Sequence, residues 1–297
     1  MSRVEKTSRS AVGILSDNDV EATIKSVRSA LEWSEGANIV LVHNGSTDAD
    51  CLMLKQLFPA IHHVWVRENR GVTAGINALF SAIGWLDEST RDFRGRVTEQ
   101  PKLFDYESPW DWVLFLSEGS EIMTLGGEPT NPGLYAPKVW KTKKLRNVPS
   151  DSPGWVDTID SWGALYSPSH KKIVHLREKN VLNYGGKSES ERFMFIVPGS
   201  AFWVHRRTIN VVGAWDESLH TYYEDVDFSM RAILAGVKLG RVTDTEIRHG
   251  LSQADQENQF HTQVLYTKNR DEIARRYQWL EQSVKPGASN ERPMGRS

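Results

Sequence analysis

Short, continuous apolar runs alternate with stretches of helical periodicity in the first third of the chain. Four runs have the length and composition of buried strands: AVGIL (11–15), NIVLV (38–42), HHVWV (62–66) and WVLFL (112–116). Between them, apolar residues recur every three or four positions, which predicts helices over 20–31, 50–58 and 72–83. Continuous apolar strands separated by amphipathic helices indicate a mostly parallel sheet that helices cover on both faces. The expected fold class is therefore α/β.

Polar, turn-forming residues follow each of the four strands. These strand tips are SDND (16–19), HNGSTD (43–48), RENRG (67–71) and SEGSE (117–121). Ligands of open α/β sheets bind in the crevice beyond the carboxyl ends of the strands. The tips therefore predict a nucleotide-binding rim, although surface loops are polar in general.

From residue 122 onward the alternation weakens, and loops rich in proline and glycine surround short strands. The charged segment 87–110 interrupts the earlier pattern and is expected to be an inserted surface loop. Residues 193–206 form two apolar runs broken at Pro198 and Gly199, and a helix is predicted over 206–213. A further helix is expected within 256–283, with these candidate packing positions: Val264, Tyr266, Ile273, Tyr277 and Leu280.

These patterns divide the chain into parts. We expect a nucleotide-binding half over residues 1–121 and a second half of the same domain over 122–254. A C-terminal helical region is expected over 255–283, followed by a disordered tail over 284–297.

Composition narrows the functional class. The 297 residues carry a formal net charge of −2, which gives no basic field for nucleic acid. Cys51 is the only cysteine, so no internal disulfide is possible, and no apolar run approaches the roughly 20 residues of a membrane span. These features predict a soluble, cytoplasmic protein. Eleven tryptophans make carbohydrate a reasonable ligand class, because sugars stack on indole rings.

Glu224, Asp225 and Asp227 lie in HTYYEDVDFSMRAILAGVKLG (220–240), where a helical pattern begins. Acids at a helix N-terminus complement the helix dipole, worth typically about 0.3–1 kcal/mol each, and this stretch alone favours that interpretation. Asp227 is expected to pair with Arg231, four residues further along the helix. The alternative is that the Glu–Asp pair performs acid–base chemistry.

Five segments in register resemble the GT-A glycosyltransferases of glycosyltransferase family 2, especially the rhamnosyltransferase-like branch. They are AVGILSDND, IVLVHNGSTD, ENRGVTAGINALFSAI, LYTKNR and the run PGSAFWVHRRTINVVGAWDESLHTYYEDVDFSMRAILAGVKLGRVTDTEIRHG. Together they cover most of residues 10–275. The resemblance implies a GT-A fold, which is a Rossmann-like, mostly parallel sheet flanked by helices, here with a C-terminal helical extension.

The resemblance also implies an inverting transfer of a sugar from a nucleotide-diphosphate donor to an acceptor hydroxyl. Asp225 would be the general base, and Glu224 would orient the site or contact the acceptor. The acceptor could be a glycan, a lipid-linked intermediate or a Ser/Thr side chain of a protein. Neither the nucleobase, the sugar nor the oligomeric state follows from the sequence.

The implied ligand contacts fall into two groups. The residues expected at the donor are Ser16, Asn18, His43, Asn44, Asn69, Arg70, Gly71, Gly75, Asn77, Ser117, Glu118 and Gly119. The residues expected at the sugar and acceptor pocket are Gly199, Ser200, Trp203 and Trp215. For Gly75 the competing interpretation is helix packing, and for each tryptophan it is core packing.

Two departures from the family pattern affect the expected chemistry. His43 stands where the family has an aspartate that contacts the nucleobase, so a preference for uridine is open. The metal-binding D-x-D is replaced by Ser117-Glu118-Gly119, which leaves Glu118 and His249 as candidate ligands for Mn²⁺ or Mg²⁺. Three outcomes follow: a weakly held metal, a metal-free enzyme that uses a cation such as Arg70 or Arg248, or loss of catalysis. The last would make the protein a non-catalytic nucleotide-sugar or glycan-binding module.

Overall fold

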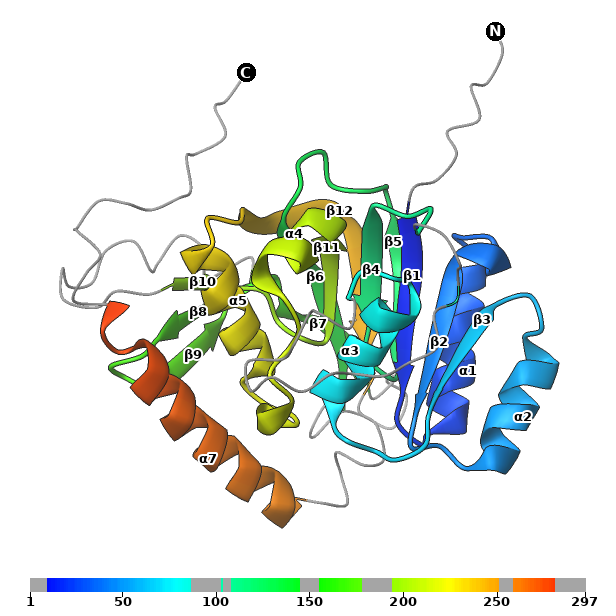
Figure 1. Ribbon diagram of the computed structural model, residues 1–297, viewed down its shortest axis with the longest axis horizontal. Coiled ribbons are helices and arrows are strands. Elements are labelled where there is room, and N and C mark those ends of the chain that lie inside the picture. Colours follow the sequence, from blue (N-terminus) through cyan, green and yellow to red (C-terminus); the bar gives the residue numbers. More distant parts are fainter. Residues whose placement is uncertain are drawn as a thin grey trace, which may run out of the picture.

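A long mixed sheet forms the centre of the molecule (Figure 1). The computed structural model describes residues 10–86, 103, 108–144, 155–177, 194–250 and 259–280. The strand order is β3-β2-β1-β4-β11-β6-β12-β5, and β7 pairs with β6 outside this path. The strands are β1 (Ser10–Ser16), β2 (Ile39–Asn44), β3 (His62–Val66), β4 (Trp112–Leu116), β5 (Ser120–Leu125), β6 (Leu134–Lys144), β7 (Trp155–Ser161), β11 (Ala201–His205) and β12 (Leu239–His249).

The predicted α/β class is confirmed. Strands β3, β2, β1 and β4 are parallel, as their continuous apolar runs indicated, and all five residues of β4 are buried. The rest of the sheet is mixed: β12 is parallel to β6, whereas β11 is antiparallel to both of its neighbours. The carboxyl ends of the four parallel strands therefore meet at one edge, which is where the polar tips lie.

Helices cover both faces of this sheet. On one face, α1 (Val20–Leu31) and α2 (Asp48–Leu57) close a core that includes Val27 and Leu54. On the other face lie α3 (Val72–Ala82), α4 (Arg206–Val212) and α5 (Glu224–Leu234), whose core includes Phe80, Ile209 and Phe228. Strands β1, β2 and β4 are thus buried on both sides, which explains their continuous apolar sequence, whereas the edge strand β3 leaves Trp65 exposed.

A second, smaller sheet lies beside the main one and has the order β10-β8-β9 (Figure 1). Its strands are β8 (Ala164–Ser167), β9 (Lys172–His175) and β10 (Met194–Ile196). Helix α7 (Gln259–Tyr277) and α5 pack against this sheet around Tyr166, Val226, Met230 and Ile273. Helix α5 therefore connects the two cores, since Phe228 belongs to the main one.

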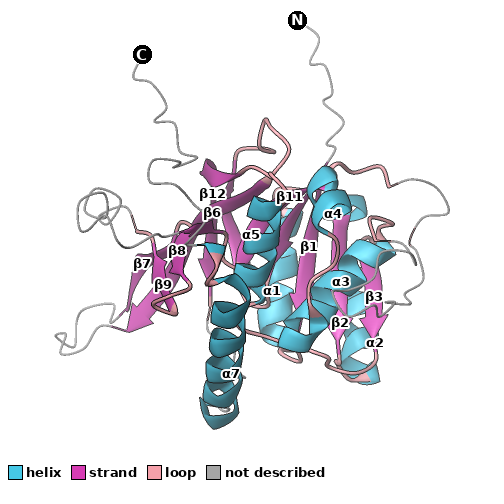
Figure 2. Cartoon of the chain, turned by 60° about the vertical axis from the view of Figure 1, so that its left-hand side comes forward, coloured by secondary structure: helices cyan, strands magenta, loops and turns pink. Residues whose placement is uncertain are grey.

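Several expectations can be compared with these elements. Of the predicted packing positions on α7, Ile273, Tyr277 and Leu280 are buried, whereas Val264 is 50% exposed and Tyr266 is 40% exposed. The prediction for Val264 was wrong because the first half of α7 extends past the smaller sheet (Figure 2). Most of the 87–110 segment and the 284–297 tail lie outside the described residues.

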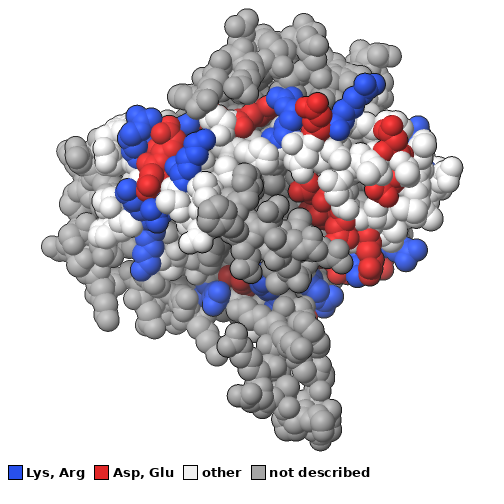
Figure 3. All heavy atoms as spheres, turned by 90° about the horizontal axis from the view of Figure 1, so that it is seen from below, with Lys and Arg blue, Asp and Glu red and all other residues white. Residues whose placement is uncertain are grey.

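Charged side chains of both signs lie on the surface. Figure 3 shows Lys/Arg and Asp/Glu side chains of both signs mixed on one face, without a continuous basic field among the residues described there. No helix within the described ranges is both long enough and apolar enough to cross a bilayer.

Candidate active site

The loop that precedes α5 has a left-handed backbone at three non-glycine residues. The φ angle is 59° at His220, 65° at Tyr222 and 67° at Tyr223. Such conformations cost about 1–3 kcal/mol each and persist only where surrounding contacts hold them. This strained loop leads directly into Glu224 and Asp225, the two residues predicted to carry the chemistry.

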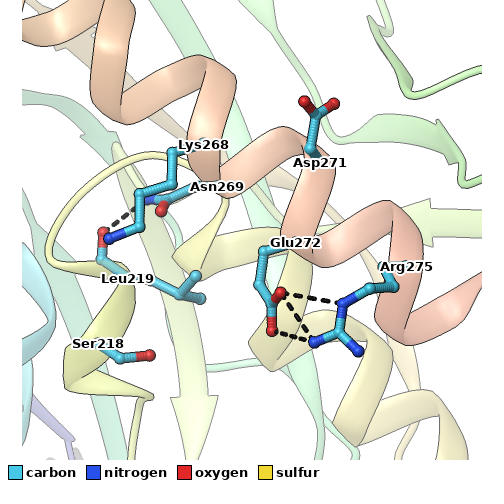
Figure 4. Close-up of a pocket in the computed structure, with 7 residues that line it drawn as sticks. All are labelled: Ser218, Leu219, Lys268, Asn269, Asp271, Glu272 and Arg275. Carbon is cyan, nitrogen blue, oxygen red and sulfur yellow. Dashed lines mark hydrogen bonds and ion pairs between the residues drawn. The ribbon is translucent and has the colours of Figure 1, made fainter.

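Asn269 on α7 supplies the contacts that hold this loop. Its amide nitrogen Nδ2 lies 2.6 Å from the carbonyl oxygen of Leu219, 2.8 Å from that of Thr221 and 3.0 Å from that of Tyr222. Figure 4 shows Asn269 directed toward Leu219 across the hollow between α7 and the 3₁₀ turn η3 (Glu217–Leu219). Because Asn269 is only 2% exposed, water competes little for these carbonyl groups.

Two carboxyl groups lie side by side at the start of α5, the buried Glu224 and the half-buried Asp225. Asp225 accepts hydrogen bonds from two backbone amides, at 3.1 Å from Gly199 and 2.8 Å from Val226. Glu224 is 8% exposed, and its oxygen Oε2 is buried without a hydrogen-bond partner among the described residues. A buried polar atom without a partner is costly, so this oxygen is a strong candidate to contact a ligand.

Burial and, to a smaller extent, the neighbouring charge of Asp225 raise the pKa of Glu224 to about 8. Burial also raises the pKa of Asp225, and the amides of Gly199 and Val226 and the nearby His175 offset only part of this shift. The two groups are close enough to titrate together. Near pH 7 we therefore place the shared proton on Glu224 and the negative charge on Asp225, where the backbone amides stabilise it.

Gly199 allows the acid pair to approach the end of the β10–β11 connection. A Cβ atom at this position would lie 2.9 Å from Oε1 of Glu224 and 3.5 Å from Cβ of Asp225. Behind the acids, a small cavity is lined by Gly199, Trp215, Phe228 and other apolar side chains. Gly199 is therefore placed to touch both acids.

Asp227 has a different role from the acids beside it. The predicted ion pair with Arg231 is present at 2.8 Å, and Asp227 also accepts from Tyr277 at 2.7 Å and from Arg276 at 3.2 Å. Arg276 in turn bonds to Asp216 at 2.8 Å. These contacts tie α5 to α7, so Asp227 fixes the helix that carries the acid pair.

The predicted donor residues converge at the carboxyl edge of the parallel strands. The amide of Asn44 donates to Oδ1 of Asn69 at 3.3 Å and to the carbonyl of Gly71 at 3.2 Å. Asn69 in turn donates to Asp17 and accepts from the amide of Gly71 at 2.9 Å. These hydrogen bonds join the tips that follow β1, β2 and β3 into one surface.

The donor edge and the acid loop are in direct contact. Gly71 has a φ of 89°, and a Cβ atom there would collide with the carbonyl and ring of His220. The amide of Thr73 donates to the same carbonyl at 3.2 Å, and Arg70 forms an ion pair with Glu217. Only glycine fits Gly71 in both its conformation and its space. The structure thus brings the third strand tip beside the predicted catalytic residues.

Some predicted donor contacts are occupied by structural partners. Asn77 is fully buried; its Nδ2 donates to the carbonyl of Trp215 at 3.0 Å and to Glu217 at 3.2 Å, and its Oδ1 accepts from the Trp215 amide at 2.8 Å. Gly75 packs against Leu15 of β1 without room for a Cβ atom. Ser16 is buried against Thr23. The geometry favours structural roles for Asn77, Gly75 and Ser16, contrary to the donor contacts expected from the sequence.

The two tryptophans of the predicted acceptor pocket are core residues. Trp203 is 1% exposed and donates to Thr245 at 3.2 Å, on the face of the sheet that α1 and α2 cover. Trp215 is 2% exposed and stacks on Phe228 with 3.6 Å between ring centroids. Because both side chains are already packed, direct contact with a sugar is disfavoured for Trp203. Trp215 supports the acid pair from behind through the small cavity.

Glu118 is held by the turn that follows β1. Its Oε1 accepts from the amides of Asp17 at 2.6 Å and Asp19 at 3.0 Å, on either side of Asn18, whose φ is 66°. Burial raises the pKa of Glu118 to about 7, although these amides oppose the shift. Glu118 therefore joins the tip after β4 to the tip after β1.

His249 completes the edge on the other side of the β4–β5 turn. Its Nδ1 lies 3.0 Å from Oγ of Ser120, and Ser117 donates to the carbonyl of Ser200 at 2.8 Å. The amide of Gly250 donates to the carbonyl of Gly119 at 3.0 Å. The residues described contain no group of three or more His, Cys, Asp or Glu side chains arranged to hold a metal ion. The side chains present do not fit a metal centre built by the protein alone.

Comparison with known families supports the resemblance noted in the sequence. The family model "Glycosyl transferase family group 2" matches residues 176–281. The match shows that this part of the chain is similar to glycosyltransferase family 2. The matched range contains the acid pair, Gly199 and α7, whereas the donor edge lies before it. The assignment to the rhamnosyltransferase-like branch stays a prediction. The comparison with curated proteins finds no match.

Solved structures support the GT-A fold. The crystal structure of GalNAc-T7 with UDP, GalNAc and Mn²⁺ aligns with a TM-score of 0.56 and 14% identity over 92% of this chain. The alignment covers 49% of the GalNAc-T7 chain, so the present chain spans about half its length. Two structures of S. aureus TarS align with TM-scores of 0.44 and 0.46, 14% and 12% identity, 83% and 96% of this chain, and 37% and 75% of theirs. The latter scores are too low to strengthen the fold assignment.

Two residues of the candidate site gave little signal in the sequence. His175, at the end of β9, is near enough to Asp225 to lower the pKa of that carboxyl group. Asn269 lies in LYTKNR, a segment that resembled the family without a role being apparent. Both come from segments remote in sequence from the acids, so only the tertiary structure shows the connection.

Proposed function

We propose that this chain is an inverting glycosyltransferase that moves a sugar from a nucleoside-diphosphate donor to an acceptor hydroxyl, with Asp225 as the general base. The observation that carries the proposal is the pair of carboxyl groups at the end of a strained loop, with Glu224 buried and Asp225 half-buried beside it. The family match and the GT-A fold support sugar transfer in general. The acceptor is a glycan or a Ser/Thr hydroxyl of a protein.

In the proposed reaction, a carboxylate oxygen of Asp225 takes the proton from the acceptor hydroxyl. The acceptor oxygen forms a bond to the anomeric carbon as the bond from that carbon to the diphosphate breaks. One displacement of this kind inverts the configuration at the anomeric carbon. The amides of Gly199 and Val226 hold the carboxylate in place, so little reorganisation is required when the proton moves.

Glu224 has the complementary task. Its protonated form is a hydrogen-bond donor, and its Oε2 lacks a partner among the described residues. We assign Glu224 to hold a hydroxyl of the acceptor or of the transferred sugar beside Asp225. A neutral neighbour also leaves Asp225 as the single negative charge of the pair.

The donor is placed at the edge formed by the tips after β1, β2 and β3. GalNAc-T7 was solved with UDP and Mn²⁺, which supports UDP-sugars as the first donors to test and manganese as the first metal. A divalent cation would neutralise charge on the departing diphosphate. Glu118 and His249 are the candidate ligands from this chain, but the mechanism above depends on neither of them.

The decisive experiment replaces Asp225 with asparagine. Asp225→Asn is expected to abolish transfer while calorimetric binding of the donor nucleotide stays within about threefold of wild type, because the amide keeps the shape of the carboxyl group. Asp244→Asn is a matched control, since Asp244 lies on β12 outside the acid loop. Equal turnover by wild type and Asp225→Asn would overturn the assignment of the base.

One observation favours a second candidate function. Ser117-Glu118-Gly119 offers a single carboxylate after β4, and that carboxylate already binds backbone amides. A non-catalytic module that binds nucleotide sugars or glycans would have the same geometry. Binding of nucleotide without turnover, with manganese and with EDTA, would establish this alternative in place of the enzyme.

A further inference from the structure

A small hollow lies at the opposite end of β1 from the donor edge. It is bounded by the first residues of β1, the turn that follows α1 and the segment that follows β5, and its volume is about 220 Å³. Strand β1 has seven residues, which span roughly 20 Å at about 3.3 Å per residue. None of the residues that line the hollow belongs to the donor edge or to the acid loop. The hollow is therefore separate from the candidate active site.

Trp33 forms one side of this hollow and presents its indole ring to solvent. Three tryptophans whose side chains the structure describes are exposed to a similar extent: Trp33 at 42%, Trp65 at 43% and Trp279 at 48%. Lys55 lies over the ring of Trp65, with 5.7 Å between Nζ and the ring centroid. The indole N–H of Trp279 donates to the carbonyl oxygen of Arg276 at 2.8 Å. Trp33 has neither kind of contact within the described residues, so both its ring face and its indole N–H can serve a ligand.

Two consecutive glycines form another wall of the hollow. At Gly127 the φ angle is 121°, which residues with a side chain rarely adopt, and a Cβ atom at Gly126 would collide with the side chain of Asp244. Both positions therefore favour glycine, which leaves the peptide groups of this wall uncovered by side chains of their own. Glu128 comes next and also lines the hollow, and its carboxyl group makes no hydrogen bond or ion pair within the described residues.

This combination of groups matches the surface of a sugar ring. The C–H groups on one face of a pyranose pack against an exposed indole ring, and its hydroxyl groups both donate and accept hydrogen bonds. The peptide groups of Gly126 and Gly127 offer donors and acceptors, and Glu128 offers a charged acceptor, which also disfavours phosphates and nucleotides. Pockets for drug-sized ligands usually measure about 300–1,000 Å³, so a hollow of about 220 Å³ suits a single ring.

We propose that this hollow is an additional carbohydrate-binding site, which takes one uncharged sugar ring with its face on Trp33 and its hydroxyl groups toward Glu128. Sugar binding here does not depend on the proposed transfer reaction, because it uses no residue of the donor edge or of the acid loop. On a glycosyltransferase, such a site raises the effective concentration of a glycan acceptor that is long enough to reach both places.

¹⁵N–¹H correlation spectra of the full chain labelled with ¹⁵N-tryptophan test this site directly. The probes are the methyl glycosides of glucose, galactose, mannose and N-acetylglucosamine, each added to about 50 mM, because a ligand of this size in an open site is expected to bind at about millimolar concentration. We expect the indole N–H resonance of Trp33 to shift along a saturable curve with at least one probe, whereas those of Trp65 and Trp279 stay in place. No shift at Trp33 with any probe, or equal shifts at all three tryptophans, would overturn the proposal without affecting the proposed function.

Variants identify the groups that bind the sugar. Trp33→Ala removes the ring platform and should weaken binding at least about tenfold, as measured by saturation-transfer difference NMR, which observes the probe. Trp65→Ala is the matched control, because Trp65 is equally exposed, and it should change the affinity by less than about twofold. Glu128→Gln should weaken binding about threefold, because a charge-assisted hydrogen bond becomes a neutral one. Unchanged affinity in a Trp33→Ala protein that keeps the urea midpoint of the wild type would overturn the site.

A cation is the competing occupant, because an indole ring and a carboxylate also attract positive charge. Tetramethylammonium chloride is therefore titrated beside the glycosides. A shift at Trp33 with this salt and none with the glycosides would overturn the choice of ligand. The trisaccharide that matches the bound glycoside distinguishes the source of the sugar ring. Binding at least about threefold tighter than that of the glycoside identifies a glycan chain, equal affinity identifies a single sugar, and either result supports the site.

Discussion

Two buried carboxyl groups of the candidate site, those of Glu118 and Glu224, have different hydrogen-bond partners. Glu118 and Glu224 are both 8% exposed, and burial raises the pKa of each. Two backbone amides of the β1–α1 turn surround Oε1 of Glu118. No described residue bonds to Oε2 of Glu224. The difference indicates that Glu118 is built into the fold, whereas Glu224 is available to a ligand.

The backbone around the two groups differs in the same way. Near Glu118 the left-handed residues are Asn18 and Gly119, types that adopt this conformation at low cost. Before Glu224 the left-handed residues include Tyr222 and Tyr223, for which it is costly. Strain held by a remote helix is typical of a functional loop, so the acid loop is the region where substitutions should affect turnover most.

After the loss of transfer expected for Asp225→Asn, the largest effect is expected for loss of the polar group at Glu224. Glu224→Leu should lower kcat about 100-fold or more, because a donor aimed at the reacting groups is removed. Glu224→Gln should retain activity within about tenfold, since its amide also donates as the protonated acid does. Steady-state kinetics with the identified donor would measure both. If Glu224→Gln were as inactive as Glu224→Leu, the negative charge would matter instead of the proton.

The next effect is expected at Asn269, which contacts no substrate in this proposal. Asn269→Leu leaves three loop carbonyls without their buried donor, so we expect a loss of about 1–3 kcal/mol in the free energy of unfolding. A displaced loop should also lower kcat about tenfold while KM for the donor stays within about twofold.

Tyr266→Phe is the control for Asn269. Tyr266 lies on the same helix and bonds through its hydroxyl to Tyr223, but it touches no loop carbonyl in the contacts described. Removal of the Tyr266 hydroxyl group should change kcat by less than about threefold. If Asn269→Leu lost stability but kept its kcat, Asn269 would have a purely structural role.

The contrast also shows what the sequence could predict. The parallel strands and their helices follow from periodicity, because each run is local in the sequence and the strands β1, β2 and β4 are buried on both faces. The acid pair was found through its motif. The contacts of Asn269 with the acid loop were not predicted. Asn269 lies 44 or more positions from the acid pair in the chain, and its hydrogen bonds go to backbone carbonyl groups, which no side-chain pattern specifies.

The residues predicted to contact the donor show the same limit of prediction from sequence. Asn44, Asn69 and Gly71 meet at the predicted edge, whereas Asn77 and Gly75 turn toward the protein interior although they belong to the same motif. A helix presents successive residues to different sides, so a motif that spans the start of α3 contains both positions at the sheet edge and positions in the core. Sequence alone does not distinguish them when all are polar or small.

A smaller effect on turnover is expected at Glu118. Glu118→Ala leaves the amides of Asp17 and Asp19 without their acceptor and should destabilise the protein by about 1–3 kcal/mol. Glu118→Gln keeps an acceptor oxygen and should cost less than about 1 kcal/mol, with kcat changed by less than about threefold. Urea denaturation and kinetics in manganese and in EDTA measure both. A large loss of activity in Glu118→Gln that occurs only in manganese would show that Glu118 binds the metal.

The last prediction concerns the pH dependence of stability, and it distinguishes Glu224 from Glu118. The folded-state pKa of Glu224 is about 8, above its ordinary value of 4.5, so the folded protein holds a proton that the unfolded chain has released over this interval. The free energy of unfolding therefore falls as pH rises from 4.5 to 8, by at most about 1.4 kcal/mol per pH unit for this group. Glu118 acts in the same direction, but its contribution ends near its folded pKa of about 7.

Urea denaturation at pH 7.0, 7.5 and 8.0 should consequently show a decline in the free energy of unfolding that Glu224→Gln removes and Glu118→Gln preserves. A decline that survives in Glu224→Gln would place the proton elsewhere than on the acid pair.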